Sequence, residues 1–227
     1  MPLKLDHELA SLMEQIQQMG TLAERMVHTV VRTLLERNPR LLSGVREDEE
    51  KMDELQVAID DHTVEMISVY TPVAADLRHL LMAARVNGEL ERVGDQAVNI
   101  CYIVEDLLTS EPIKPLEDIP KAAAISEEML RRSLLAFRTK STDEAMAVIE
   151  QDTQVDALCD ALFKELVGLM DKSAGNSRRA LGLILISRAI ERVADHAVNI
   201  CEDTIYMATG RDVRHMRHGQ EPGKSPR

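Results

Sequence analysis

Residues 91–101 read ERVGDQAVNIC and residues 191–201 read ERVADHAVNIC, so one stretch occurs twice in this chain of 227 residues. Nine of the eleven positions are identical, and the copies start 100 residues apart. An internal repeat of this kind indicates two copies of one structural unit. Each copy carries a Glu and an Asp at a spacing that puts both carboxylates on one helix face, about 5–6 Å apart at Cβ. These pairs are Glu91 with Asp95 and Glu191 with Asp195.

The amino-acid composition favours helices. Hydrophobic residues make up 44% of the chain, which is enough for a packed core, whereas aromatic residues make up only 2% and Trp is absent. The core must therefore consist mainly of Leu, Ile, Val, Met and Ala, a mixture that suits helices better than strands. Together with the repeat, this composition predicts an all-α fold of two three-helix bundles.

The charge and the cysteine content narrow the class of function. The formal net charge of -12 repels nucleic acid, so DNA or RNA binding is not expected. The three cysteines form no CxxC pair, which argues against a zinc finger or a disulfide framework, and Cys101 and Cys201 are expected to be small core residues. No apolar signal-peptide core and no uninterrupted apolar run of ~18 residues occurs. We therefore expect a cytoplasmic protein that contacts membranes only through its partners.

Apolar residues recur every three or four positions along six segments, which predicts six helices. Leu5, Leu9 and Leu12 begin such a row in the first of them. Thr71 is a good N-cap and Pro72 a good first helical residue, so the third helix is expected to start there. The predicted helices cover residues 4–38, 41–69, 72–108, 121–139, 142–171 and 178–209, and Ser141 or Thr142 is expected to cap the fifth.

A proline-rich segment separates the two halves. Three prolines between residues 109 and 120 interrupt the helical period and indicate a linker. We therefore divide the chain into a first three-helix repeat (1–110), a linker (111–120) and a second three-helix repeat (121–210). Residues 211–227 hold five Lys or Arg and no apolar period, which predicts a disordered tail. Long helices leave broad apolar flanks, so self-association is expected, most simply as a homodimer.

The acidic pairs are candidate metal ligands. The helix that precedes each copy of the repeat carries a second acidic pair at the same spacing. Like charges at this spacing destabilise a helix by about 0.2–0.5 kcal/mol, a cost that a bound cation would remove. Carboxylates suit cations such as Mg²⁺, Mn²⁺, Ca²⁺ or iron. The predicted ligands are Glu49, Asp53, Glu91, Asp95, Asp152, Asp156, Glu191 and Asp195, with Asn99, Asn199, Asp60 and Asp160 as possible second-row residues.

Salt bridges could also account for these acids. An arginine lies three residues before Asp95, Asp195 and Glu191, so simple ion pairs on a solvated helix face could neutralise them. His196 follows Asp195 directly and is expected to point elsewhere. Neither a Glu-x-x-His motif, a P-loop nor a nucleophile with a base at fixed spacing occurs, so an enzyme is not expected. The alternatives are a carboxylate-bridged metal hydrolase, in which two ions clamp a phosphoryl group, and a metal-free helical scaffold.

Five segments resemble the PhoU family of bacterial phosphate-transport regulators, over about residues 5–215. ELERVGDQAVNIC and AIERVADHAVNIC are similar to the repeated E(D)xxxD motif of that family, and TPVAADLRHL is similar to its Pro-x-x-x-Asp-Leu-Arg segment. AIDDHTVEMI and VIEQDTQVDAL also fit. The second repeat has AGNSRRALGL in place of the Pro-x-x-x-Asp-Leu-Arg segment.

The resemblance implies both an architecture and a function. It implies two three-helix bundles with approximate two-fold symmetry, and multinuclear iron or zinc clusters held by the E(D)xxxD acids. It further implies a cytoplasmic adaptor between the phosphate ABC transporter, through its ATPase subunit, and a sensor histidine kinase. In that role the protein would be a negative regulator of phosphate uptake and of phosphate-starvation signalling.

Overall fold

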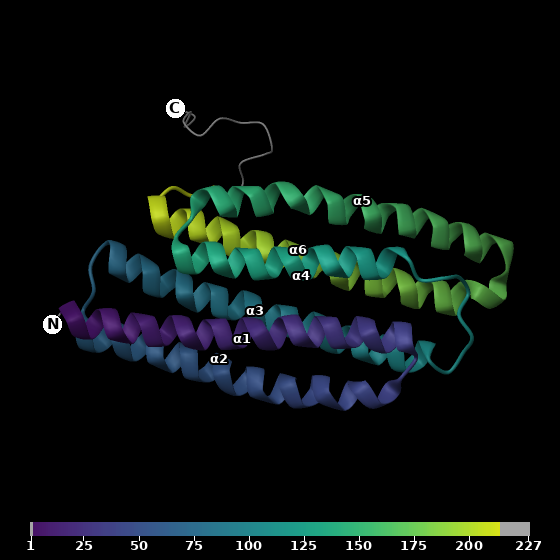
Figure 1. Ribbon diagram of the computed structural model, residues 1–227, viewed down its shortest axis with the longest axis horizontal. Helices are drawn as coiled ribbons and strands as arrows, with labels where there is room; N and C mark the ends of the chain where they lie inside the picture. The colour runs from purple at the N-terminus through teal and green to yellow at the C-terminus, as the bar shows by residue number, and fades with distance from the viewer. Residues whose placement is uncertain (1, 214–227) are drawn as a thin grey trace.

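The computed structural model describes residues 2–213, with side chains from residue 4, as long helices joined by short turns and one longer linker (Figure 1). No strand occurs in this part of the chain, so the predicted all-α class is confirmed. Two short 3-10 helices, Pro39–Leu41 and Ala174–Asn176, precede the second and the sixth long helix. The long helices are α1 (Pro2–Glu36), α2 (Leu42–Tyr70), α3 (Ala75–Leu107), α4 (Asp118–Thr139), α5 (Thr142–Lys172) and α6 (Ser177–Thr209).

The helices form two three-helix bundles that lie side by side. α1, α2 and α3 pack against one another, as do α4, α5 and α6, and the bundles meet where α1 packs on α4 and α3 packs on α6 (Figure 1). α3 and α6 run antiparallel, because Arg85 in the first half of α3 pairs with Asp203 near the end of α6, whereas Arg178 at the start of α6 pairs with Asp106 at the end of α3. The two copies of the repeat therefore cross each other around an approximate two-fold axis, as predicted.

The apolar row of the first helix faces the core. Leu12, Ile16, Met19, Ala23 and Met26 are almost inaccessible to solvent, as the three-and-four spacing predicts. The core that they enter consists mainly of Leu, Ile, Val, Met and Ala, with Phe137 as its one fully buried aromatic ring among the described residues. The helical interpretation of the composition is thus confirmed.

The repeated stretch has nearly the same burial in both copies. Its carboxylates lie at the edge of the core, with Glu91 and Glu191 half-buried and Asp95 and Asp195 exposed. The expectation that the cysteines are core residues is confirmed. The buried pairs are Val93 and Val193, Gly94 and Ala194, Ala97 and Ala197, Ile100 and Ile200, and Cys101 and Cys201.

The start of the third helix was predicted wrongly. α3 begins at Ala75 rather than at Pro72. Thr71 adopts a left-handed conformation, with φ 46°, and its N–H donates to the carbonyl of Ile67 at 3.1 Å, so it closes the last turn of α2. Proline is common directly after such a C-terminal cap, because it cannot continue the helix. The Thr-Pro pair therefore marks the end of α2 and not the start of α3.

The linker between α3 and α4 covers residues 108–117, so it begins and ends three residues before the assigned segment 111–120. α4 begins at Asp118, so Pro120 lies in the first helical turn, where a missing N–H leaves no helical hydrogen bond unmade. Lys114 in the linker forms ion pairs with Asp118 and with Glu165 of α5, which tie the linker to the second bundle. Of the predicted tail, residues 214–227 lie outside the described residues.

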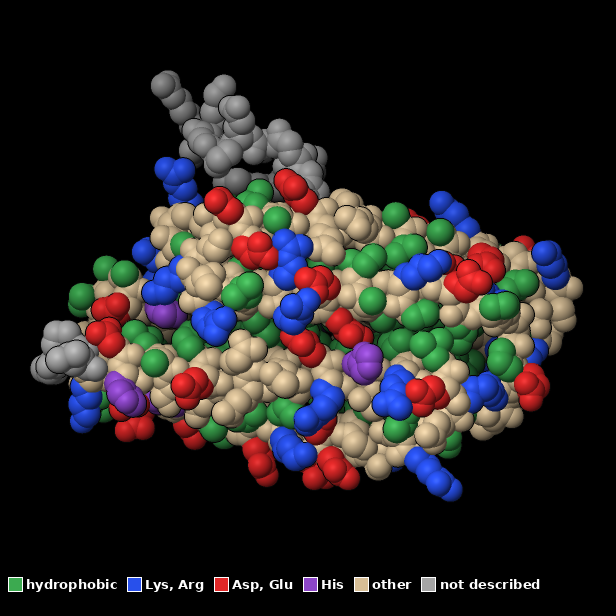
Figure 2. Space-filling model, viewed as in Figure 1, with side chains coloured by type: hydrophobic (Ala, Val, Ile, Leu, Met, Phe, Trp, Pro, Cys, Tyr) green, Lys and Arg blue, Asp and Glu red, His purple; other side chains and the backbone are tan. Residues whose placement is uncertain are grey.

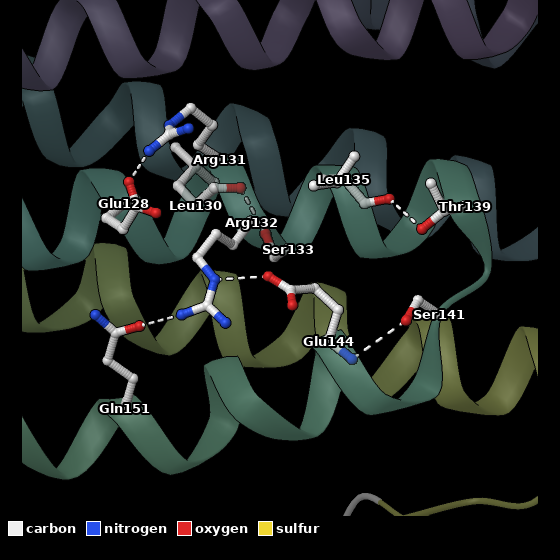
Figure 3. A network of polar contacts seen from close by, with 10 residues as sticks. All are labelled: Glu128, Leu130, Arg131, Arg132, Ser133, Leu135, Thr139, Ser141, Glu144 and Gln151. Carbon is white, nitrogen blue, oxygen red and sulfur yellow. Dashed lines mark hydrogen bonds and ion pairs between the residues drawn. The ribbon is translucent and has the colours of Figure 1, made fainter.

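Cap chemistry positions the turn between α4 and α5. The hydroxyl of Ser141 accepts the N–H of Glu144 at 3.2 Å, which is the N-cap expected from the sequence. Beside this cap, Arg132 of α4 donates to Glu144 at 2.6 Å and to Gln151 at 2.8 Å (Figure 3). The two bonds from Arg132 hold α5 against α4 along its first three turns, whereas the Ser141 bond caps α5 itself.

The face of the molecule shown in Figure 2 is largely polar. Acidic and basic side chains are interspersed over the face shown in Figure 2, and hydrophobic side chains gather in the seam between the two bundles. None of the helices within residues 2–213 combines the length and the apolar character needed to cross a membrane.

Candidate functional site

The first acidic cluster consists of four carboxylates on two neighbouring helices, α2 and α3. Burial raises the pKa of Glu49, and the nearby charges of Asp53 and Asp95 raise it further. Burial likewise raises the pKa of Glu91, again with Asp95 and Asp53 adding to the effect. Because each of these glutamates responds to an aspartate on the other helix, the structure brings the two predicted acidic pairs together. Folding therefore concentrates negative charge along this part of the α2–α3 contact.

The second acidic cluster lies at the equivalent place on α5 and α6. Partial loss of solvent on folding raises the pKa of Asp195, although much of its side chain stays exposed, and the charges of Glu191 and Asp156 raise it further. Asp152 is half-buried one turn before Asp156 on α5. Arg188 donates to Glu191 at 2.5 Å, so one of the simple salt bridges that the sequence suggested does form in this cluster.

The two clusters suit a cation in donor type and in electrostatics. Each offers hard carboxylate oxygens from two facing helices, and like charges held together favour a bound positive ion. However, no group of three or more His, Cys, Asp or Glu side chains between residues 4 and 213 converges tightly enough to hold an ion as it stands. Asp53, Asp95, Asp156 and Asp195 are exposed side chains on helix surfaces. Ligation would thus require their carboxylates to rotate inward, a change that an exposed rotamer makes readily.

The possible second-row residues lie in other contacts. Asn199 donates to Glu89 at 2.9 Å, and Asp60 accepts a hydrogen bond from Asn87 at 2.9 Å. Asp160 lies 3.7 Å from a guanidinium nitrogen of Arg188. Asn99 is exposed on α3. Asp160 is thus linked to Glu191 of the second cluster through Arg188, whereas the contacts of Asn199 and Asp60 involve no cluster carboxylate.

A buried glutamate that the sequence analysis missed connects the two repeats. Glu89 of α3 accepts hydrogen bonds from the ring of His196 at 2.8 Å and from Asn199 at 2.9 Å, both on α6. Arg92, three residues further along α3, also donates to Glu89 at 2.7 Å. These hydrogen bonds, above all that from His196, hold the pKa of Glu89 below its usual value although burial opposes the shift. His196 therefore points away from Asp195, as expected, and toward the other repeat.

The two repeats differ at both positions of this contact. Position 96 is Gln in the first copy and His in the second, and position 89 is Glu in the first repeat where Ala189 stands in the second. The contact of Glu89 with His196 therefore has no equivalent between Ala189 and Gln96.

The TPVAADLRHL segment lies at the opposite end of α3 from the linker. Arg78 donates to the carbonyl of Met207 at 3.2 Å, so it joins the start of α3 to the end of α6. His79 is buried, and its ring lies edge-on to that of Phe137 of α4, with 6.1 Å between the ring centroids. Burial lowers the pKa of His79 to about 4, so its ring is neutral at physiological pH.

Comparison with known proteins agrees with this architecture. The PhoU domain model matches twice, over residues 16–104 and 119–204. A phosphate-specific transport system accessory protein PhoU homolog from Aquifex aeolicus is 34% identical over 222 residues, which cover 98% of this chain and 100% of that protein. A homolog from Zymomonas mobilis is 31% identical over 216 residues, with 95% and 91% of the two chains covered.

Solved structures lead to the same family. The crystal structure of PhoU from Pseudomonas aeruginosa superposes with a TM-score of 0.87 at 28% identity, covering 91% of this chain and 99% of that one. The phosphate transport system regulatory protein PhoU from Streptococcus pneumoniae gives a TM-score of 0.83 at 26% identity, covering 92% and 99%. Two matched domains, relatives of more than 30% identity over nearly their whole length and the shared six-helix architecture establish that this chain belongs to the PhoU family.

Proposed function

We propose that the protein is an accessory regulator of phosphate-specific transport. The observation that carries this proposal is the similarity to proteins named as phosphate-specific transport system accessory proteins, which spans both repeats and nearly the full length of both chains. Because this similarity spans both repeats and each repeat carries an acidic cluster, we expect the regulator to use both repeats.

The protein would act as a cytoplasmic adaptor. Its partners would be the ATPase subunit of the phosphate ABC transporter and a sensor histidine kinase, and its effect would be negative regulation of phosphate uptake and of starvation signalling. Long antiparallel helices present extended faces on which helices or domains of a partner can dock. Hydrophobic side chains remain exposed on such faces, among them Val57 and Val64 on α2 and Phe163 on α5, and they are compatible with a homodimer or with partner binding.

Metal ions, iron or zinc in the first place and Mn²⁺ or Mg²⁺ otherwise, would bind at the two acidic clusters. Support comes from the raised pKa values of Glu49, Glu91 and Asp195, each caused by burial and by a neighbouring carboxylate. A bound cation would neutralise this repulsion and would stabilise the contact of α2 with α3 and of α5 with α6. Its role would therefore be to stiffen the surfaces that partners contact.

The proposed role is not enzymatic. The cysteines are poor candidates for nucleophiles, because burial raises the pKa of Cys101 to about 11 and raises the pKa of Cys159 and Cys201 as well. A thiol needs a lowered pKa and access to solvent to react as a thiolate.

The experiment that tests the proposal combines elemental analysis with partner capture. Protein purified without chelator would be assayed for metals and for retention of the ATPase subunit and the kinase. The test variant carries four substitutions, Glu91→Gln, Asp95→Asn, Glu191→Gln and Asp195→Asn. A matched control also removes four negative charges, but from exposed acids outside the clusters: Glu54→Gln, Asp61→Asn, Glu150→Gln and Asp171→Asn.

Wild type and control are expected to carry metal and to retain both partners, whereas the test variant is expected to lose the metal and to bind the partners more weakly. If elemental analysis finds no metal in the wild-type protein, the proposal that the acidic clusters bind metal is wrong. Equal capture with and without metal would limit the metal to a structural role. If neither partner is retained and deletion leaves phosphate regulation unchanged, the adaptor proposal is wrong.

A further inference from the structure

A cavity of about 480 Å³ lies where the linker crosses between the two repeats. Its walls come from the ends of α1 and α3, from linker residues 111–116 and from the first turns of α6. The floor is apolar and includes Leu34, Leu107 and Leu183, all of which are buried. A cavity of this size is in the range of small-molecule binding sites. We call it the linker pocket.

Two arginines at the rim of the linker pocket have no acidic partner. Arg37 donates to the carbonyls of Leu108 and Ser110, at 3.1 and 2.8 Å. Arg179 donates to the carbonyl of Glu111 at 2.8 Å. Among residues 4–213 neither guanidinium forms an ion pair with a carboxylate, whereas the third cation of the rim, Lys114, forms two. Arg179 also donates to the carbonyl of Gly175 at 3.2 Å and to the side-chain oxygen of Asn176 at 3.1 Å. These neutral acceptors hold both guanidinium groups in place without neutralising their charge.

The pseudo-symmetry of the fold shows what fills the equivalent space at the other end of the molecule. The two domain matches begin at residues 16 and 119, and in that register Leu34 of α1 corresponds to Phe137 of α4. In the register of the repeated stretch, Arg179 of α6 corresponds to His79 of α3.

At the far end, His79 and Phe137 are both buried and pack ring against ring. At the linker end, an aliphatic side chain and an arginine stand in their places. Leu34 lacks the volume of a phenyl ring, and Arg179 extends toward the linker carbonyl of Glu111. The linker pocket thus occupies a place that the second half of the fold fills with two aromatic rings.

We propose that the linker pocket binds a small organic monocarboxylate with an apolar body. The apolar part would lie against Leu34, Leu107 and Leu183, and the carboxylate would meet Arg37 and Arg179 at the rim. Nη2 of each arginine already donates two hydrogen bonds, so the carboxylate would accept one charge-assisted hydrogen bond from another N–H of each guanidinium. The ligand would contact both repeats and the linker at once.

The test uses three probes that share one apolar body: 4-phenylbutyrate, 4-phenylbutanol and 4-phenylbutylamine. Each is titrated into the full-length protein labelled with ¹⁵N, and amide shifts are followed by NMR. The acid is expected to bind with a dissociation constant on the order of 1 mM, as suits a ligand of this size. It should shift the amides of residues 108–116, apart from Pro112 and Pro115, which have no N–H. The alcohol should bind about tenfold more weakly, because it lacks a charge-assisted hydrogen bond, and the amine weakest of all.

Two kinds of variant test the walls and the rim separately. The double variant Leu34→Phe with Arg179→His copies the aromatic pair of the other end and should abolish binding of the acid. Arg37→Gln should weaken the acid about tenfold and leave the alcohol unchanged. Arg138→Gln is the matched control, since Arg138 is an exposed arginine at the far end of α4 from the linker, and it should change nothing.

Failure of the acid to bind wild type would overturn the proposal, as would equal binding of acid and alcohol or shifts away from residues 108–116. Unchanged binding in both the double variant and Arg37→Gln would do the same. If the double variant does not fold, Arg37→Gln decides alone, because it alters one exposed side chain. None of these outcomes bears on the transport role, which partner capture tests independently.

Discussion

The carboxylate of Glu89 in the first repeat lies 2.8 Å from Nδ1 of His196 in the second repeat. Glu89 is buried, and Asn199 and Arg92 donate to it as well. This contact is the main polar link that the structure shows at the centre of the α3–α6 interface. Glu89 precedes Glu91 by two residues and His196 directly follows Asp195, so each partner neighbours one acidic cluster along its own helix.

Replacing Glu89 with Ala, the residue at position 189, should lower the free energy of unfolding by about 2 kcal/mol, because three donors lose a buried acceptor. Urea unfolding monitored by circular dichroism measures this loss. The matched control Glu54→Gln removes an exposed carboxylate of α2 and should change stability by less than about 0.5 kcal/mol. A loss no larger than that of the control would show that the contact does not hold the repeats together.

The pH dependence of stability should have opposite signs at Glu89 and at Glu91. The folded-state pKa of Glu89 is lowered, so its carboxylate stabilises the fold above its unfolded-state pKa, and this contribution is lost as pH falls through the lowered folded-state pKa. In chelator-treated protein, the deficit of Glu89→Gln relative to wild type should therefore be full at pH 7 and should shrink as pH falls below about 4.

The folded-state pKa of Glu91 is raised, so protonated Glu91 favours the fold below the unfolded-state pKa, and this contribution is lost as pH rises through the raised folded-state pKa. Glu91→Gln should accordingly stabilise the metal-free protein at pH 7 by roughly 0.3 kcal/mol and should lose this gain below about pH 4. Parallel pH profiles for the two variants would contradict the opposite electrostatic environments of these residues.

Metal addition should reverse the ranking of wild type and the Glu91→Gln, Asp95→Asn variant. Without metal, the variant should be the more stable, because it lacks one pair of repelling charges. With free Mn²⁺, Zn²⁺ or Fe²⁺ at 100 times its dissociation constant, wild type should gain about 2.7 kcal/mol per intact site, and the variant should gain at one cluster only. Thermal melts with and without chelator, together with elemental analysis, measure both effects. An equal gain in the two proteins would place the ions elsewhere.

Two glycines in helix interiors should respond to alanine in opposite directions. A Cβ at Gly20 of α1 would overlap Cδ1 of Leu134, a buried side chain of α4, so Gly20→Ala should destabilise the interface between the bundles by about 1–2 kcal/mol. A Cβ at Gly88 of α3 would meet no atom within 4 Å, so Gly88→Ala should stabilise the protein by about 0.5–1 kcal/mol through helix propensity. Thermal unfolding distinguishes them, and stabilisation by Gly20→Ala would mean that α1 and α4 do not pack closely at this point.

The sequence by itself determined the class of the fold and the pairing of its acids. The three-and-four spacing of Leu12, Ile16 and Met19 depends only on helix geometry, and the burial of this row follows from it. The same geometry puts Glu91 and Asp95 on one face. The duplication then predicts that equivalent positions of the repeated stretch have equivalent burial, and the buried side chains of Cys101 and Cys201 agree with this.

Helix ends were less predictable, because one signal can serve two helices. Thr71 and Pro72 suit the start of a helix as well as the end of one, and only the left-handed backbone of Thr71 decides between them. Pro120 at the end of the assigned linker belongs to the first turn of α4 for a similar reason, since proline is compatible with both places.

Only the tertiary structure decided which residues meet across the two repeats. Glu89 lies 107 positions before His196, and their contact depends on the antiparallel register of α3 on α6, which no local spacing encodes. The linker pocket depends on the same register, because Leu107 and Leu183 come from opposite ends of those helices. Local patterns specify which face of a helix is buried, whereas the packing of whole bundles specifies what that face is buried against.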